Sequence, residues 1–166
     1  MDLFAFVKPK NELESRPEEQ TNVPFVPEEM WTKCPKCGTM LLTTDMEENF
    51  RVCTKCGHHF RMNAKQRVAL LADDGSFCEH DANMASKNIL DFPGYDQKLE
   101  KARATGSKES VMCGECKIGG IDAVLCAMDS DFMMGSMGTV TGEKITRAFE
   151  YATENALPVI VCTVSG

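Results

Sequence analysis

Two cysteine-rich segments have the residue types and the spacing of a metal site. Each follows the pattern Cys-x-x-Cys-Gly. Zn²⁺ takes four ligands in a tetrahedron, and thiolate sulfur suits it. Two intervening residues let both thiolates of one segment reach the same ion, and the glycine permits the tight turn that follows. The pattern predicts a zinc ribbon, rather than disulfides or unrelated thiol pairs, with one structural Zn²⁺ ion bound by Cys34, Cys37, Cys53 and Cys56.

A second candidate site is a glycine-rich stretch that precedes a predicted helix. Its candidate residues are Gly135, Ser136, Met137 and Gly138. The stretch is not a P-loop, since Gly142 is followed by Glu143, and it lacks the Gly-x-Gly-x-x-Gly pattern of dinucleotide-binding proteins. Backbone N–H groups near a helix N-terminus suit an anion or a developing oxyanion, whereas a structural turn is the alternative interpretation. The neighbouring methionines fit either a packed core or a pliable acyl pocket.

Two further groups of reactive side chains receive a structural interpretation. Cys113 and Cys116 form a third Cys-x-x-Cys pair, for which thiol redox chemistry is one hypothesis. A redox pair is activated at a helix N-terminus, whereas these cysteines fall in a predicted strand, so the sequence favours an incidental pair. His58 and His59 are predicted to be surface residues, because four cysteines leave the zinc ion no vacant position.

Composition places the chain among soluble intracellular proteins. It has 166 residues, a hydrophobic fraction of 43% and nine cysteines, of which five lie outside the ribbon pattern. Such a length suits one ordinary domain with a small metal module. The unpaired cysteines indicate a reducing, cytoplasmic compartment. Neither a secretory signal nor an apolar run of about 18 residues is present, so no membrane span is predicted.

Charge is distributed unevenly along the chain. The formal net charge is −7, yet residues 32–67 contain seven lysines and arginines against three acidic residues. That segment is therefore +4 and the remainder −11. A basic ribbon on an acidic body predicts a nucleic-acid patch, for which the alternative is partial balancing of four thiolates around the metal.

The elements that must position these residues fall into three parts. Residues 1–30 are predicted to be a flexible arm, residues 31–62 the zinc ribbon, and residues 63–166 an incomplete body of mixed α/β class. Within the ribbon, a β-hairpin over 39–52 is expected to bring the two cysteine pairs together, with Trp31 covering one side. Further on, a capping-box pair predicts a helix that ends at a glycine and packs through its own apolar side. The pair is Asn63 and Gln66, the glycine is Gly75, and the apolar side is Val68, Leu70 and Leu71.

The body is predicted to contain a hairpin followed by a parallel βαβ unit. Strands at 111–118 and 121–128 flank Gly119-Gly120, a suitable two-residue turn. An irregular stretch and an exposed helix at 95–104 precede them. A helix at 143–155 then leads to a strand at 159–164, whose apolar β-branched residues predict burial on both faces. The apolar face of the predicted helix at 143–155 comprises Ile145, Ala148, Phe149, Ala152 and Ala156.

Taken in order, several motifs resemble a known family over nearly all of the chain after the arm. They are Trp31, the two Cys-x-x-Cys-Gly segments, Phe60-Arg61-Met62, Arg67 with Leu70-Leu71-Ala72-Asp73, Asp131-Phe132, Met134-Gly135-Ser136-Met137-Gly138, Gly142-Glu143-Lys144, and Pro158-Val159-Ile160 leading to Ser165-Gly166. Together they resemble the β subunit of bacterial acetyl-CoA carboxylase carboxyltransferase. The ribbon combined with the Met-Gly-Ser-Met-Gly loop is the specific part of this resemblance.

The resemblance implies a fold and a reaction. The fold is a crotonase-like spiral of ββα units with an appended zinc ribbon. The reaction moves a carboxyl group from carboxybiotin, held on a biotin carboxyl carrier protein, to acetyl-CoA, giving malonyl-CoA for fatty-acid biosynthesis. The active site lies between this subunit and an α subunit of an α2β2 assembly. A nucleic-acid-binding or regulatory role of the ribbon is the alternative function, since RNA binding has been proposed for the family.

The resemblance also assigns roles to the glycine-rich stretch. Gly135, Ser136, Met137 and Gly138 are implied to lie at the acyl-CoA and oxyanion region. Gly166 is implied to supply backbone to a second oxyanion motif. In the family that motif continues beyond Ser165-Gly166, so its donor pair is incomplete here and this chain alone is expected to be inactive.

Overall fold

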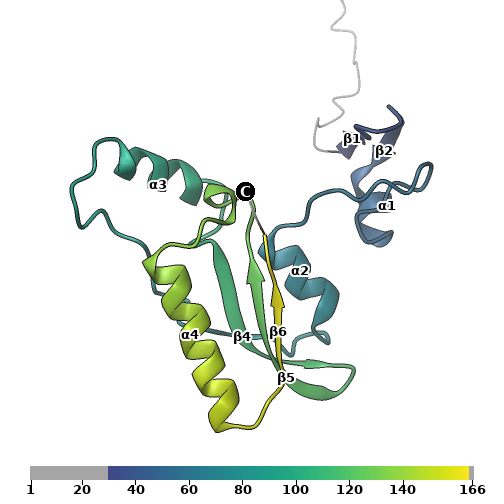
Figure 1. Cartoon of the computed structure of the whole chain (residues 1–166). Helices are drawn as coiled ribbons and strands as arrows, with labels where there is room; N and C mark the ends of the chain where they lie inside the picture. Colours follow the sequence, from purple (N-terminus) through teal and green to yellow (C-terminus); the bar gives the residue numbers. More distant parts are fainter. Residues whose placement is uncertain (1–29, 165–166) are drawn as a thin grey trace, which may run out of the picture.

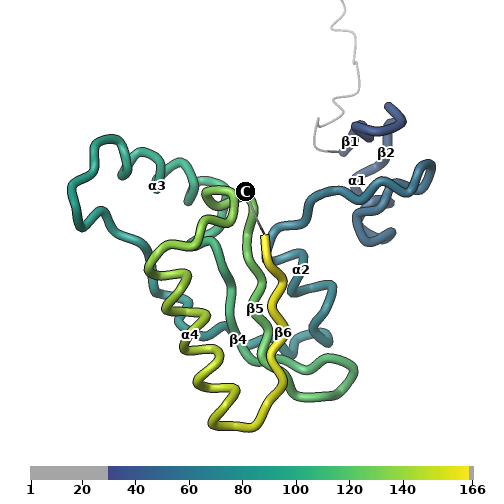
Figure 2. Tube along the Cα trace, in the orientation of Figure 1, coloured from purple at the N-terminus to yellow at the C-terminus, as the bar shows by residue number. Residues whose placement is uncertain are grey.

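The computed structural model describes residues 30–164 (Figures 1 and 2). Gly166 and all but the last residue of the predicted arm lie outside this range. In chain order the elements are β1 (Trp31–Lys33), β2 (Met40–Leu42), α1 (Thr43–Glu48), α2 (Ala64–Leu71), β3 (Cys78–His80), α3 (Tyr95–Arg103), β4 (Val111–Ile118), β5 (Ile121–Met128), the 3₁₀ turn η3 (Met133–Gly135), α4 (Thr139–Glu154) and β6 (Val159–Cys162). None of the helices in this range is long and apolar enough to cross a membrane.

A four-stranded sheet in the order β3-β4-β5-β6 forms the centre of the body. Strands β4 and β5 form the predicted antiparallel hairpin, with Ile118 opposite Ile121. Gly119 and Gly120 both adopt positive φ, as a type I′ turn requires, and their N–H groups donate to the carboxylate of Asp73 at 2.8 and 2.7 Å. Strands β5 and β6 are parallel, which confirms the predicted βαβ connection through α4.

Helices cover both faces of this sheet, with α4 on one side and α2 on the other (Figure 1). The side chains of β5 alternate between the two layers, so that Cys126 packs with Ala148 of α4 while Leu125 packs with Val68 of α2. Six consecutive β5 residues, 123–128, are buried. β5 is therefore the more fully buried of the two inner strands, and the unit β4-β5-α4 is one ββα repeat.

Strand β6 differs from its prediction in burial. Ile160 is 37% exposed and the other three residues of β6 are half-buried, whereas the sequence predicted burial on both faces. Within the described residues β6 pairs only with β5, so it is an edge strand and its apolar side chains are not fully buried. The short strand β3 was not predicted, because Cys78–His80 has no alternation of apolar and polar residues and is identified only by its pairing with β4.

Helix α4 begins earlier than predicted, and this changes the glycine-rich stretch. Gly138 is the N-cap residue, and the N–H of Gly142 donates to its carbonyl at 2.9 Å. The loop therefore ends at Gly138, while Gly142 lies inside the first turns of the helix. On the predicted apolar face, Ala148 and Ala152 are buried, but Phe149 is 46% exposed.

Helices α2 and α3 were partly predicted. The capping box of α2 is present, since the side chain of Asn63 accepts from the N–H of Gln66 at 2.9 Å and the reciprocal bond measures 3.1 Å. The helix ends at Leu71, before Gly75, and Leu70 points outward instead of joining the core. Helix α3 is charged as expected, but its residues Leu99 and Ala102 are buried.

The ribbon has a different internal structure from the one predicted. β1 and β2 form a hairpin around the first cysteine pair, and an isolated bridge between Val52 and His59 closes the second. Between the pairs lies α1 instead of a hairpin, and this helix buries Met46 within the ribbon. Trp31 remains 43% exposed and does not cover the ribbon.

Candidate functional site

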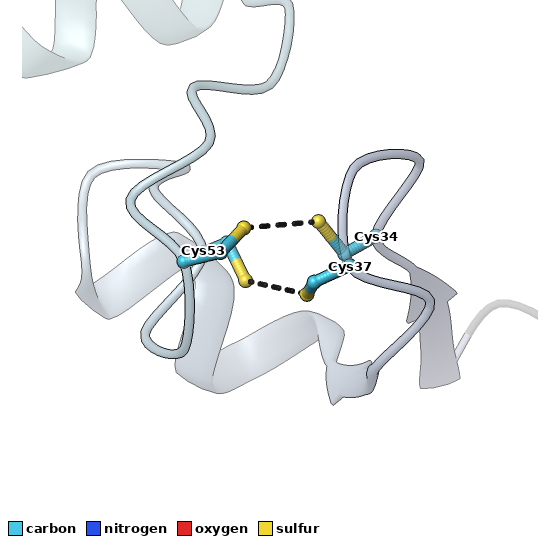
Figure 3. A group of neighbouring side chains, drawn as sticks. Cys34, Cys37 and Cys53 are labelled. Carbon is cyan, nitrogen blue, oxygen red and sulfur yellow. Dashed lines mark hydrogen bonds between the residues drawn. The ribbon is translucent and has the colours of Figure 1, made fainter.

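The four predicted metal ligands come together in the structure. The Sγ atoms of Cys34, Cys37, Cys53 and Cys56 all lie within 4.8 Å of one another. The Sγ atoms of Cys34 and Cys56 are 3.7 Å apart, and those of Cys37 and Cys53 are 3.8 Å apart. Figure 3 shows Cys34, Cys37 and Cys53 of this cluster. A tetrahedron with Zn–S bonds of about 2.3 Å has edges of about 3.8 Å, so this arrangement fits Zn²⁺.

The two cysteine pairs have the same backbone structure, which explains why the same five-residue pattern occurs twice. The N–H of Gly38 donates to the Cys34 carbonyl, and that of Gly57 donates to the Cys53 carbonyl, both at 2.9 Å. Both glycines have positive φ, 73° and 68°. Each turn thus curls the backbone around the sulfur position and needs glycine at its end.

The site is a closed one. Cys34 and Cys53 are buried, and four thiolates complete the coordination of Zn²⁺ without His58 or His59. The side chain of Cys37 is hydrogen-bonded to the hydroxyl of Thr39 at 3.3 Å, which lowers its pKa to about 6 and favours the thiolate. A zinc ion bound here has no open position for substrate, so its role is structural.

The third cysteine pair cannot act as a dithiol. Cys113 belongs to the core under α4, whereas Cys116 belongs to the core under α2, so the two side chains lie on opposite faces of the sheet. A hydrogen bond with Cys126 raises the pKa of Cys113, and burial raises that of Cys116. A redox pair needs a lowered thiol pKa, and the redox hypothesis is therefore wrong.

The glycine loop, residues 133–138, has an unusual backbone. Met133, Met134 and Gly135 have consecutive positive φ values of 46°, 56° and 73°. This region suits glycine but costs about 1–2 kcal/mol for each residue with a side chain. Two backbone bonds close the turn, from the N–H of Gly135 to the Phe132 carbonyl at 2.9 Å and from that of Ser136 to the Met133 carbonyl at 3.1 Å. Strain held in this way is typical of functional loops.

Packing holds the strained loop in place from two sides. Phe132 is 1% exposed and packs with Leu99 and Ala102, which explains why these two residues of α3 are buried. On the other side, a Cβ atom at Gly135 would lie 3.0 Å from the Cβ of Val164, just after β6. The loop therefore lies at the carboxyl ends of the parallel strands β5 and β6, where ligands of open α/β sheets commonly bind.

Two buried hydroxyls fix one peptide of the loop. The hydroxyl of Ser110 lies 2.7 Å from the Ser136 carbonyl and 2.6 Å from the hydroxyl of Thr141. A carbonyl can only accept, so the single proton of Ser110 goes to Ser136 and Thr141 must donate to Ser110. Because C=O and N–H point in opposite directions across a trans peptide, the N–H of Met137 points away from Ser110.

The Ser110 and Thr141 pair leads to a stability prediction. Ser110→Ala leaves the buried Thr141 hydroxyl and the Ser136 carbonyl without their hydrogen-bond partner. We expect it to lower the free energy of unfolding by about 1–3 kcal/mol. Adding Thr141→Val removes the unsatisfied hydroxyl, so the double variant should be more stable than Ser110→Ala alone. Urea unfolding of the three proteins measures this order, and a double variant less stable than the single one would contradict the assigned bonds.

A cavity of about 660 Å³ lies between the glycine loop and α3. Of the predicted residues, Ser136, Met137 and Gly138 line it, whereas Gly135 is buried beneath the loop. Lys98 and Lys101 line the opposite wall. No local pattern indicates these lysines, because only the burial of Phe132 brings α3 to the loop. The other predicted site residue, Gly166, lies outside the described residues.

Two domain families match this chain. The acetyl-CoA carboxylase zinc finger domain matches residues 31–56, and the carboxyl transferase domain matches residues 59–166. An acetyl-coenzyme A carboxylase carboxyl transferase subunit beta of Clostridium botulinum is 50% identical over 149 residues, which are 89% of this chain and 52% of the relative. The corresponding subunit of Ruminiclostridium cellulolyticum is 47% identical over 98% of this chain and 57% of its own length. The chain thus spans about half the length of these relatives.

Solved structures share the fold. A single-chain, multi-domain long-chain acyl-CoA carboxylase has a TM-score of 0.53 at 24% identity, over 64% of this chain and 11% of that protein. Transcarboxylase 12S gives the same TM-score at 23% identity, over 64% of this chain and 19% of its own. These likenesses confirm the expected mixed α/β fold. With the carboxyl transferase match extending over well more than half of the residues, this chain belongs to the carboxyl transferase domain family.

Proposed function

We propose that this protein is the β subunit of an acetyl-CoA carboxylase carboxyltransferase, and that it transfers a carboxyl group from carboxybiotin to acetyl-CoA to give malonyl-CoA. The observation that carries the proposal is the glycine loop, which lines a cavity at the carboxyl ends of β5 and β6 and whose Met137 and Gly138 N–H groups have no acceptor among the described residues. The zinc centre stabilises the ribbon and takes no part in the chemistry.

The proposed reaction creates two oxyanions. Releasing the carboxyl group from carboxybiotin makes a ureido oxyanion, which takes a proton from the methyl group of acetyl-CoA. The thioester enolate formed in this way then bonds to the released carboxyl carbon. Both require preorganised hydrogen-bond donors more than a nucleophile. Among the described residues, the N–H groups of Met137 and Gly138 have no hydrogen-bond partner, and they immediately precede the N-terminus of α4. These donors and the helix dipole favour negative charge at the same place.

The remaining lining of the cavity suits a reaction that must avoid water. Met134 and Met137 line it with exposed side chains, and Phe132 and Met133 lie at its base. An apolar environment strengthens hydrogen bonds to an oxyanion and slows the hydrolysis of carboxybiotin. Methionine side chains also adapt readily to the shape of an acyl group.

We further propose the partners that this reaction needs. They are an α subunit, in an α2β2 assembly with the active site between the subunits, and a biotin carboxyl carrier protein, all in the cytoplasm. Gly166 is proposed to contribute a backbone donor of a second oxyanion motif. The closeness of Val164 to Gly135 supports this proposal, because it brings the end of the described chain to the glycine loop.

Substitution at Met137 tests the role of the loop. Met137→Pro removes one N–H group, and the preceding residue Ser136 already has the extended backbone, ψ 133°, that proline requires. In the full-length protein with its α subunit, we expect a fall in kcat of about a hundredfold, as for loss of one oxyanion donor. Met137→Ala keeps the N–H group and should stay within a few-fold of the original rate. Equal rates for the two variants would reject the proposed role.

A second candidate function is binding of single-stranded nucleic acid by the ribbon. Trp31 is 43% and Phe50 64% exposed, and Lys33, Lys36 and Lys55 are also exposed. Aromatic surfaces beside basic residues suit base stacking with phosphate contacts. Phosphate contacts would make log Kd for single-stranded RNA vary with log salt by about 0.7 for each contact. An affinity that does not change between low and high salt would reject this function.

A further inference from the structure

The side chains of two lysines on the cavity wall formed by α3 make no hydrogen bond or ion pair with the described residues. We propose that Lys98 and Lys101 of α3 bind the phosphate groups of the CoA thioester, while the glycine loop binds its acyl end. This inference rests on the proposed function and names the residues that recognise the nucleotide part of the substrate.

The packing of α3 places both lysines on the cavity. Leu99 and Ala102 lie on the buried side of the helix against Phe132, which fixes the rotation of α3 about its axis. Lys98 and Lys101 are one helical turn apart, so they lie on the same strip of the helix surface, and both line the cavity. They therefore form a pair of cations facing the loop that presents Met137.

The side chains of two neighbouring basic residues donate hydrogen bonds to the protein, whereas those of Lys98 and Lys101 do not. Arg103 donates to the Ser86 carbonyl at 2.7 Å, and Lys108 donates to the Ala82 carbonyl at 3.3 Å. The ammonium groups of Lys98 and Lys101 make no hydrogen bond or ion pair with any residue between 30 and 164. Basic side chains without protein partners, in a chain of net charge −7, are suited to an anionic ligand.

The carboxylates near the cavity do not neutralise the lysines. Glu109 is 5% exposed and accepts from the N–H of Ser86 at 2.9 Å, so its charge is already hydrogen-bonded. Asp131 is exposed and belongs to the segment that leads into the glycine loop. Neither residue forms an ion pair with Lys98 or Lys101 among the described residues.

The arrangement of the cavity matches the chemistry of a CoA thioester. Such a ligand has a reactive thioester at one end, a long neutral pantetheine arm, and phosphates at the other end. The cavity has backbone donors on one wall, apolar side chains including Phe132 and Met133 between, and two ammonium groups on the other wall. Lysine is a suitable point charge for phosphate, since its three donors rotate to meet the ligand.

The test compares substrates with and without phosphates in the full-length protein with its α subunit. The variants are Lys98→Gln, Lys101→Gln and the double substitution, and Lys117→Gln on the β4–β5 hairpin is the matched control for loss of one charge. We expect the double variant to raise KM for acetyl-CoA about tenfold with little change in kcat. KM for acetyl-pantetheine, which lacks phosphates, should not change, and Lys98→Arg should retain most of the affinity. Acetyl-dephospho-CoA separates contacts to the 3′-phosphate from contacts to the diphosphate.

The outcomes distinguish this inference from the proposed function. If the original protein transfers the carboxyl group but the double variant has the same KM for acetyl-CoA, the lysine assignment is overturned and the proposed function stands. An equal rise in KM for acetyl-pantetheine would also overturn it, because the lysines would then affect the arm or the fold. If the original protein shows no transfer, the proposed function fails, and calorimetric titration with CoA still tests the lysines. Equal Kd values for the original protein and the double variant would then contradict the inference.

Discussion

Replacing Cys53 with serine is expected to release the zinc ion and unfold the ribbon, while the four-stranded sheet stays folded. The ribbon buries few residues, namely Cys34, Leu41, Met46 and Cys53, with the half-buried Cys56 and Phe60 packed against the cysteines. A module of this size rarely folds without a metal or a disulfide. Structural zinc sites contribute on the order of 10 kcal/mol to folding, and three thiolates without the fourth cannot complete the tetrahedron.

Zinc content and limited proteolysis measure this effect. The original protein should carry one zinc ion per chain, and Cys53→Ser should carry far less and be cleaved between residues 31 and 62. Cys78→Ser is the matched control, because Cys78 is an exposed cysteine outside the cluster. A Cys53→Ser protein that retains its zinc and resists cleavage would contradict the assignment of the ligands.

Replacing Phe132 with alanine is expected to cost about 3–5 kcal/mol in the free energy of unfolding, the usual range for a buried phenylalanine. Phe132 is the largest fully buried side chain among the described residues, and it joins α3 to the glycine loop. Its loss removes the packing that balances the strain at Met133 and Met134. The substitution should therefore disturb the loop as well as lower stability.

Denaturant unfolding and proteolysis of α3 together test this prediction. Met134→Ala is the matched control, because Met134 is 68% exposed and its truncation leaves no cavity. We expect Phe132→Ala to be cleaved faster within residues 89–105, where α3 is released from the loop. A change of less than about 1 kcal/mol, typical of a surface substitution, would show that α3 does not depend on this contact.

The features that could be predicted from the sequence depend on local spacing. The two Cys-x-x-Cys-Gly segments specify the ligands of one ion, and Gly119-Gly120 specifies a hairpin turn because both positions need positive φ. The Asn63 and Gln66 cap was likewise readable, since its bonds span only three residues. In each case the physical determinant lies within a few residues of the motif.

The features that could not be predicted depend on contacts between distant segments. The cavity exists because Phe132 packs against α3, about thirty positions earlier in the chain, and no pattern in the charged helix indicates this. β3 is formed only through its pairing with β4. The early start of α4 was missed because Gly142 suggested a continuing loop, although a glycine is tolerated within a helix at a cost of about 1 kcal/mol.

The positions of the two lysines and of the Ser110 and Thr141 pair belong to the same class. Hydroxyl and ammonium groups are common on protein surfaces, and only the fold shows that one pair is buried under the loop and the other faces a cavity. The glycine loop itself was located from its composition. Its left-handed backbone at Met133 and Met134 was not predictable, because side chains usually avoid that region.

The most direct test of the central claim is transfer of a labelled carboxyl group. The full-length protein and its α subunit are mixed with acetyl-CoA and ¹³C-carboxybiotin, and the products are analysed by mass spectrometry. We predict malonyl-CoA that carries the label in its new carboxyl group, formed much faster than by either subunit alone. Release of the label only as bicarbonate, with no malonyl-CoA above the level of the single subunits, would contradict the proposed function.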